Sequence, residues 1–296
     1  MTHVLGIDIG NSGLRIAELD VPQRRLGRML RINWLAPGQP PHDRDGQRRY
    51  PPDRPEWTGL LGEFVQAAGG DPDGPTAWWI SSVRRDAGAV LQQYLHDSGA
   101  MRVSMVDYHQ LPLHVDVAAP QRVGIDRLLA ALAASQLTET RPAVVIQAGS
   151  AVTVDLLLPP PLSRDGQLRQ PRSWATFAGG AILPGIPMML RLLGQGADLL
   201  PQLDAGELET LPPLPGKNTE QAMLCGTASA LVGGVRHLVE RYRQQFGAQV
   251  PVILSGGDGM RLVPFLSPPL MDVPHLVHLG LLQLAAAAEH SVEQIS

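Results

Sequence analysis

Cysteine is nearly absent from this sequence. Cys225 is the single one among 296 residues, so an intramolecular disulfide framework is excluded. Its neighbours are Ala, Met, Leu and Gly, a setting typical of a small core residue and not of a nucleophile. We therefore expect a protein of a reducing compartment, the cytoplasm.

Charge and long apolar runs are also scarce. Charged residues make up 18% of the chain, the formal net charge is -4, and no basic stripe is visible, so no nucleic acid partner is expected. The longest apolar runs, near 222–235 and 276–288, are interrupted by Gly, Thr, His or Gln and are too short to span a bilayer. The first residues lack the charged and apolar regions of a signal peptide, so we expect no membrane partner either.

Hydrophobic residues are plentiful, at 44%, and the length is sufficient for two domains. In the first part of the chain, antiparallel strands precede an alternation of helices and strands, which favours a mixed sheet covered by helices. The expected elements are a hairpin at 4–19, strands at 26–35, 76–83 and 101–107, and helices at 57–68 and 87–98. The proline-rich segment 36–55 is expected to be a surface loop.

The second part repeats the opening pattern, because 143–158 also predicts a hairpin with a turn of small residues. The domain boundary is expected at the irregular stretch 112–122, which gives domains at 1–115 and 116–296. The other expected elements are strands at 174–177 and 250–254, a turn at 179–185, and helices at 126–136, 188–193, 220–246 and 276–289. The helix at 220–246 is expected to break near Gly226 and Gly233-Gly234.

Asp8 is the first candidate for a functional group. A run of apolar strand residues delivers its carboxylate to a glycine turn, and an unpaired carboxylate is costly to bury without donors or a metal. A plain hairpin, whose Asp and Asn serve only the turn, is the alternative. Two further glycine turns follow strands, at 147–150 and 255–259. Backbone amides at such turns make anion-binding concavities, so the turns could hold the phosphates of a nucleotide between the domains.

Two familiar phosphate motifs do not fit. The stretch 216–219 is not a P-loop, because neither Ser nor Thr follows Lys217 and no glycine lies five residues before Gly216. The opening is not a Rossmann fingerprint, because a strand and not a helix follows Gly13.

Four ordered motifs resemble those of the type III pantothenate kinases, which belong to the superfamily of acetate kinase, sugar kinases, Hsp70 and actin. They are Asp8-Ile-Gly-Asn-Ser12, Gly124-Ile-Asp-Arg127, Ala148-Gly-Ser-Ala-Val-Thr153 and Gly179-Gly-Ala-Ile-Leu-Pro-Gly185. The resemblance covers nearly the whole chain. It implies an α/β fold of two ribonuclease H-like (actin-type) domains, each a mixed β-sheet with flanking helices. The implied activity is ATP-dependent phosphorylation of pantothenate to 4'-phosphopantothenate, the first step of coenzyme A biosynthesis, in a cytoplasmic homodimer.

The resemblance also assigns roles to residues. Asp126 is similar to the family's catalytic carboxylate, which accepts the proton of the attacking hydroxyl. Asp8 would orient the magnesium that accompanies ATP, and a monovalent cation, K+ or NH4+, is implied as well. The implied ATP and phosphate contacts are Asp8, Gly10, Asn11, Ser12, Gly149, Ser150, Gly256 and Gly257. The implied substrate contacts are Gly124, Asp126, Arg127, Gly180 and Thr219, and Thr219 would reach the site of the neighbouring subunit.

Simpler roles compete with these assignments. Asp126 could be an N-cap or first-turn residue of a helix, Arg127 a surface residue, and Thr219 only a helix cap. Gln147 is the main departure, because the family usually has an aspartate there, and the loss of this charge predicts a weaker magnesium site. Asp155 is the nearby acid that could compensate. A catalytically weakened regulatory member, or a kinase of another small alcohol, are the alternative functions.

Overall fold

The computed structural model describes residues 3–35, 39, 41–43, 45–68, 76–161, 174–203 and 214–293. The chain forms two compact units, which we describe separately. Unit 1 contains Met1–Pro112, Ala119–Ala133 and Leu276–Ser296, and unit 2 contains Leu113–Ala118 and Ala134–His275. The units thus differ from the expected domains 1–115 and 116–296, because two later segments of the chain return to unit 1.

Unit 1 is built on a six-stranded sheet in the order β4-β3-β2-β1-β5-β6. β1 pairs antiparallel with β2 and parallel with β5, so the sheet is mixed, as the sequence predicts. The strands are β1 (Val4–Ile9), β2 (Gly13–Asp20), β3 (Arg25–Trp34), β4 (Arg49–Tyr50), β5 (Ala77–Ser82) and β6 (Arg102–Met105). β4 lies within the expected surface loop 36–55, of which positions 36–38, 40 and 44 lie outside the described residues.

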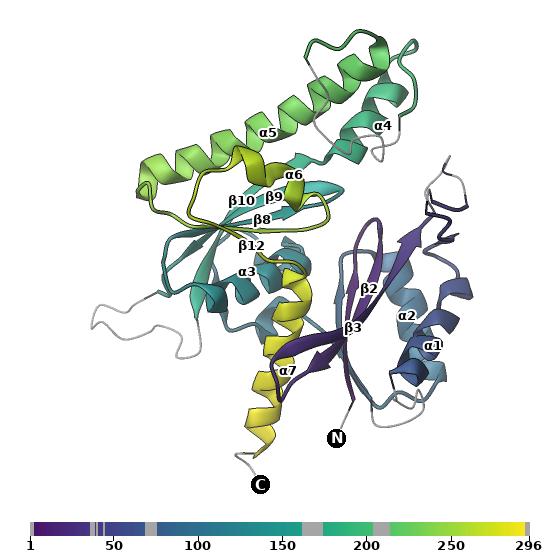
Figure 1. The fold of residues 1–296 in the computed structure, drawn as a ribbon. Coiled ribbons are helices and arrows are strands. Elements are labelled where there is room, and N and C mark those ends of the chain that lie inside the picture. The colour runs from purple at the N-terminus through teal and green to yellow at the C-terminus, as the bar shows by residue number, and fades with distance from the viewer. Residues whose placement is uncertain are drawn as a thin grey trace. The chain divides into compact units, whose positions relative to one another are not determined.

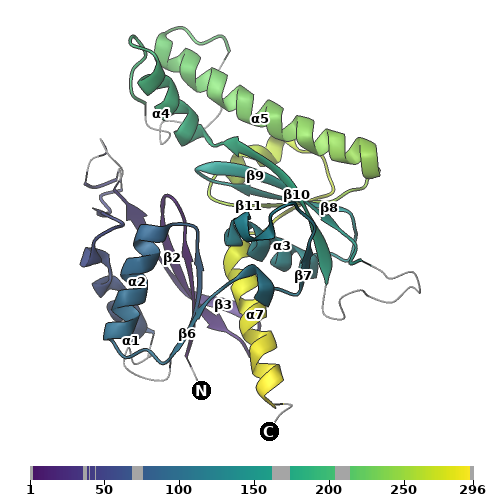
Figure 2. The same ribbon diagram turned by 180° about the vertical axis from the view of Figure 1, so that it is seen from behind.

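Helices cover both faces of this sheet (Figures 1 and 2). Leu5, Ile7 and Ile9 of β1 point to one face and join the hydrophobic core formed with α1 and α2. On the other face, a Cβ at Gly6 would lie 3.2 Å from Leu281 of α7, so β1 and α7 approach closely. The helices are η1 (Pro55–Trp57), α1 (Gly59–Ala67), α2 (Arg85–Asp97), η2 (Tyr108–Gln110), η3 (Pro120–Arg122), α3 (Ile125–Leu137), which continues into unit 2, and α7 (Leu276–Glu293).

Unit 2 is built on a second six-stranded mixed sheet, in the order β12-β11-β8-β9-β10-β7. β8 pairs antiparallel with β9 and parallel with β11, which repeats the arrangement of β1, β2 and β5. The strands are β7 (Leu113–Val115), β8 (Ala143–Ala148), β9 (Ala151–Leu158), β10 (Ala175–Pro184), β11 (Val252–Ser255) and β12 (Leu270–Asp272). The helices are α4 (Ile186–Gly196), α5 (Thr219–Phe246), α6 (Gly259–Leu262) and η5 (Val263–Phe265). Two mixed sheets with flanking helices confirm the α/β class of two ribonuclease H-like domains.

α5 corrects the expected break near Gly226 and Gly233-Gly234, because the helix is continuous over 28 residues. A glycine inside a helix costs only about 1 kcal/mol, and the buried side of α5 packs into the core of unit 2. The unbroken helix also corrects the expectation that the apolar run near 222–235 is too short to span a bilayer. By length and composition alone, α5 could cross a membrane. Its buried residues, among them Met223, Leu231 and Val235, belong to the hydrophobic core of unit 2.

β10 corrects a second expectation, because one strand replaces the expected strand 174–177 and turn 179–185. The register shifts between Phe177 and Gly180, which is a β-bulge. Gly179 has φ of 84°, and a Cβ at Gly180 would lie 2.3 Å from the carbonyl oxygen of Val154. The two glycines therefore let the strand bend without ending.

Gly280 gives a test of the packing in unit 1. A Cβ at this position of α7 would lie 2.3 Å from the carbonyl oxygen of Leu129 in α3, so Gly280→Ala forces the helices apart. We expect it to destabilise the protein by about 1–3 kcal/mol in urea unfolding. Gly226→Ala is the matched control, because nothing lies within 4 Å of its Cβ in α5, and it should be stabilising by about 0.5–1 kcal/mol. Equal effects of the two substitutions would contradict this packing.

Candidate active site

Three neighbouring strands of unit 1 place Arg15, Asp8 and Ser81 side by side. The register pairs Asp8 of β1 with Arg15 of β2 and with Ser81 of β5, so the three side chains share one face of the sheet. The Ser81 hydroxyl donates a hydrogen bond of 3.1 Å to Oδ1 of Asp8. Asp8 is only 7% exposed and Ser81 is fully buried. The structure thus holds one carboxylate in the middle of the sheet, with a single serine donor and an arginine on its two sides.

A second carboxylate, that of Asp126, acts on the first. Burial raises the pKa of Asp8 to about 6, the charge of Asp126 raises it too, and Arg15 and the Ser81 hydrogen bond lower it. Burial also raises the pKa of Asp126, against the lowering effects of the Arg127 amide and guanidinium. Both acids belong to unit 1, so the interaction lies within one compact body. Two neighbouring acids whose pKa values are raised are a common feature of catalytic sites.

The turn after β1 has a fixed shape, because its carbonyl oxygens are bonded. The indole Nε1 of Trp34 donates to the Gly10 oxygen at 3.0 Å, and the Trp34 amide donates to the Ser12 oxygen at 3.0 Å. Arg84 donates from Nη1 to the Asn11 oxygen at 3.0 Å. The predicted first phosphate turn is therefore held from β3 and from the segment after β5.

Arg84 is itself fixed in place by Asp86. Nε of Arg84 lies 2.8 Å from Oδ1 of Asp86, and Nη2 lies 3.0 Å from Oδ2, which is a two-pronged ion pair. The hydrogen bonds from Arg84 lower the pKa of Asp86. Sequence reasoning missed Arg84 and Trp34, because their contacts join residues far apart in the chain. Arg15 could have been found from the hairpin register alone.

Asp126 is a first-turn residue of α3, as the simpler role proposed. Its Oδ1 accepts a hydrogen bond of 2.9 Å from the Arg127 amide, and a Cβ at Gly124 would lie 2.5 Å from the same oxygen. Glycine at 124 is therefore required for this placement of the carboxylate. Within the described residues, Oδ2 of Asp126 has no hydrogen bond from another element, so the carboxylate keeps an oxygen able to accept a proton.

Unit 2 contains the other two predicted phosphate turns, and they contact each other. A Cβ at Gly256, whose φ is 103°, would lie 2.1 Å from the oxygen of Ala148, and the Asp258 amide donates to that oxygen at 3.1 Å. The Gly185 amide donates to the Ser150 oxygen at 3.0 Å. The turns 147–150 and 255–259 and the end of β10 thus form one cluster of closely packed backbone.

Gln147 occupies in unit 2 the place that Asp8 occupies in unit 1. It pairs with Thr153 of β9 and with Ser255 of β11, just as Asp8 pairs with Arg15 and Ser81. Oε1 of Gln147 and Oγ1 of Thr153 are buried and have no hydrogen-bond partner in the described part of the chain. Asp155, 1% exposed, lies two residues beyond Thr153, where a Cβ at Gly180 would be 2.4 Å from its Oδ1. The charged set is therefore in unit 1 and the neutral set in unit 2.

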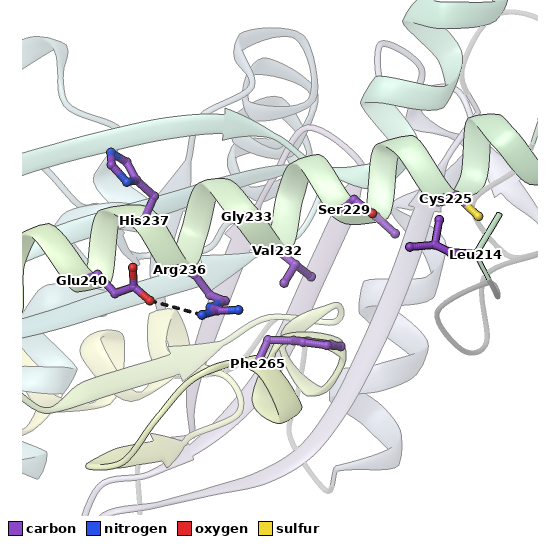
Figure 3. A pocket seen from close by; sticks show the side chains of 10 residues that line it. Leu214, Cys225, Ser229, Val232, Gly233, Arg236, His237, Glu240 and Phe265 are labelled. Carbon is purple, nitrogen blue, oxygen red and sulfur yellow. Dashed lines mark hydrogen bonds and ion pairs between the residues drawn. The ribbon is translucent and has the colours of Figure 1, made fainter. Parts of the chain in front are cut away.

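Each unit has one cavity to consider. That of unit 1 has a volume of about 520 Å³, and its lining includes Gly124 and Ile125, next to Asp126. That of unit 2, about 440 Å³, follows α5 and is drawn in Figure 3. None of the predicted site residues lines the α5 cavity, and its Arg236 and Glu240 pair with each other at 3.3 Å. The cavity of unit 1 is therefore the candidate for the substrate.

The predicted site residues divide between the units. Unit 1 contains Asp8, Gly10, Asn11, Ser12, Gly124, Asp126 and Arg127, and unit 2 contains Gly149, Ser150, Gly180, Thr219, Gly256 and Gly257. Thr219 is the exposed first residue of α5, and the side chain of Asn218 before it caps the helix by accepting from the Gln221 amide at 2.8 Å. Cys225 is buried, as expected of a core residue.

The sequence comparisons identify one family. A family model described as "Type III pantothenate kinase" matches residues 4–241. The Type III pantothenate kinase of Rhodopirellula baltica is 31% identical over 95% of this chain and 97% of its own length. That of Chromobacterium violaceum is 35% identical over 71% and 80%. A solved structure from Campylobacter jejuni, described as a Baf family transcriptional activator, has a TM-score of 0.52 at 19% identity over 97% and 99%, which shows the fold alone.

The raised pKa of Asp8 gives a test by stability. Its pKa is about 6 in the folded chain and near 3.8 when solvated, so burial of the charge costs stability as the pH rises through 6. Asp8→Asn keeps the acceptor for Ser81 and removes this cost, and we expect the variant to be more stable than wild type by about 1–3 kcal/mol at pH 8. Below about pH 3, where wild-type Asp8 is protonated in both states, the gain should vanish. Urea unfolding at both pH values measures it, and a variant less stable at pH 8 would contradict this electrostatic picture.

Proposed function

The chain belongs to the type III pantothenate kinase family, and from this premise we propose how its residues phosphorylate pantothenate with ATP. The observation that carries the proposal is the pair of carboxylates of buried Asp8 and half-buried Asp126, which lie in one unit together with a bonded glycine turn and a cavity. Phosphoryl transfer needs mainly positioning and charge neutralisation, so this small set of groups is sufficient for the chemistry.

Asp126 is the proposed general base. The primary hydroxyl of pantothenate attacks the γ-phosphorus of ATP, its proton passes to Asp126, the bond from phosphorus to the β–γ bridging oxygen breaks, and ADP leaves. A carboxylate with a raised pKa holds the proton better than an ordinary aspartate. Arg127 stabilises the charged form of Asp126 and stands at the reacting end of the substrate.

Magnesium fits Asp8 in the form in which it accompanies ATP. No group of three or more His, Cys, Asp or Glu side chains that could hold a metal occurs in the described part of the chain, so a cage made by the protein alone is absent there. Mg2+ binds instead through one or two carboxylates together with phosphates and water. Asp8 meets this requirement, because its carboxylate is buried and the effects of Arg15 and Ser81 do not offset that burial in its pKa. When bound, the metal supplies neutralisation of phosphate charge. Asp155 is the second candidate ligand.

The remaining contacts are proposed on the family pattern. Gly10, Asn11 and Ser12 of unit 1, and Gly149, Ser150, Gly256 and Gly257 of unit 2, would contact phosphate groups. Gly124 and Gly180 would contact the substrate, as would Thr219 of the partner subunit in a homodimer. A monovalent cation, K+ or NH4+, and a cytoplasmic location complete the proposal. The regulatory alternative has no support among the relatives, whose names describe kinases.

Asp126→Asn tests the proposed base. The amide keeps the size and the acceptor oxygen but cannot take the proton, so we expect kcat to fall by about 10²- to 10⁴-fold with little change in the circular dichroism spectrum. In wild type, kcat should fall with decreasing pH through the raised pKa of Asp126. ADP release should be followed with pantothenate, Mg2+ and K+ or NH4+. Absence of turnover in wild type under these conditions would refute the proposed function, and normal turnover by the variant would refute the role of Asp126.

Substitution of Gln147 tests how a neutral side chain at this position affects the binding of Mg2+. Gln147→Asp restores the acid that the family carries there, and we expect the Mg2+ concentration for half-maximal activity to decrease. Gln147→Asn is the matched control, since it shortens the side chain equally but adds no charge. An inactive wild type that gains activity only through Gln147→Asp would favour the regulatory alternative.

A further inference from the structure

The cavity of unit 1 contains an arginine that the proposed mechanism does not use. The lining combines the segment after β5, one side of α2, the segment after β6 and the approach to α3. The lining includes Arg84, Arg85, Gly88, Gln92, Asp107 and Gly124. We call this space the acceptor cavity. It is concave, partly polar and next to Asp126, which is what a small polar substrate requires.

One side of α2 forms a wall of the acceptor cavity. Arg85, Gly88, Ala89 and Gln92 are spaced at i, i+3, i+4 and i+7, so they lie on the same side of the helix. Gly88 and Ala89 are small, and a Cβ at Gly88 would already lie 3.0 Å from Oγ of Ser82. Between the long polar side chains of Arg85 and Gln92, the wall therefore has no large side chain.

Arg85 differs from the other charged residues of this lining, Arg84 and Asp107, because its side chain has no bonding partner in the described part of the chain. Arg84 is bonded to both oxygens of Asp86 and to the oxygen of Asn11. Asp107, the acid of the lining, caps η2 by accepting from the His109 amide at 3.0 Å. The guanidinium of Arg85 has no hydrogen bond or ion pair within the described residues, and its side chain is exposed. It is thus available to a ligand without breaking an existing contact.

Pantothenate has a carboxylate that a free guanidinium could bind. Its phosphorylated hydroxyl and its carboxylate are at opposite ends of the molecule. The hydroxyl belongs near Asp126, next to Gly124 of the cavity, and Arg127 acts on Asp126 at that same end. The carboxylate therefore needs a different cation, and a charge-assisted contact with a guanidinium is the strongest that a side chain offers.

We propose that Arg85 binds the carboxylate of pantothenate and so makes the enzyme prefer the acid to neutral analogues. The inference rests on the proposed function. It assigns Arg85 to substrate selection and not to the transfer step, because the residue lies on α2 and the reacting groups lie on β1 and α3. Loss of Arg85 should then raise KM for the acid and leave kcat nearly unchanged.

The experiment compares two substrates and four proteins. The substrates are pantothenate and pantothenamide, in which a primary amide replaces the carboxylate. In Arg85→Gln we expect KM for pantothenate to rise about 10- to 100-fold, KM for pantothenamide to change less than about 2-fold, and kcat to stay within about 2-fold. Arg85→Lys keeps the charge and should recover part of the loss. Arg54→Gln is the matched control, since Arg54 is an exposed arginine of unit 1 outside the cavity.

The outcomes separate this inference from the proposed function. If wild type and Arg85→Gln show the same ratio of kcat/KM for acid over amide, Arg85 does not read the carboxylate, although the kinase activity stands. The same conclusion follows if Arg54→Gln lowers the ratio as much as Arg85→Gln does. A wild type that phosphorylates neither compound overturns the proposed function and this inference together. A ratio that falls in Arg85→Gln and partly recovers in Arg85→Lys supports the inference.

Discussion

The burial of a carboxylate in the centre of a sheet is the constraint on which unit 1 depends. Asp8 lies on a strand that is buried on both faces, its donor is one serine, and a second acid raises its pKa further. Such an arrangement lowers stability, so it persists only because the packing on both sides of the strand fixes it. In the proposed mechanism, the same buried charge would give the site its affinity for a cation, and its raised pKa would let it hold a proton. The burial of the Asp8 carboxylate thus both lowers the stability of the fold and underlies the proposed chemistry.

The two units share an arrangement but not its charges. Asp8, Arg15 and Ser81 correspond in register to Gln147, Thr153 and Ser255. In unit 1 this set contains a carboxylate and a guanidinium, whereas in unit 2 it is neutral, and two of its polar atoms are buried without a described partner. A repeated fold therefore does not imply a repeated function. The proposed catalytic groups, Asp8 and Asp126, both lie in unit 1, and the site residues proposed for unit 2 are mainly those of backbone turns.

Local patterns predicted much of this structure. Alternation and glycine turns were sufficient for both hairpins and for the position of Asp8 at the end of β1, because these features depend on neighbours in the chain. The unbroken α5 and the bulged β10 were not predictable, since packing against distant residues outweighs the preference of glycine. Trp34 and Arg84 were missed for a similar reason: each is bonded to the first turn across a long separation in sequence. The return of α7 to unit 1 left no signal in its own sequence.

This return has a consequence for how the protein is made. α7 covers the face of β1 on which Asp8 lies, and His278 of α7 donates from Nε2 to the backbone oxygen of Arg15 at 3.2 Å. All of unit 2 lies between β1 and α7 in the sequence, so the ribosome releases α7 long after it has released β1. The growing chain must therefore carry an uncovered sheet face until synthesis reaches residue 276, and unit 1 cannot close around its carboxylates before unit 2 has emerged.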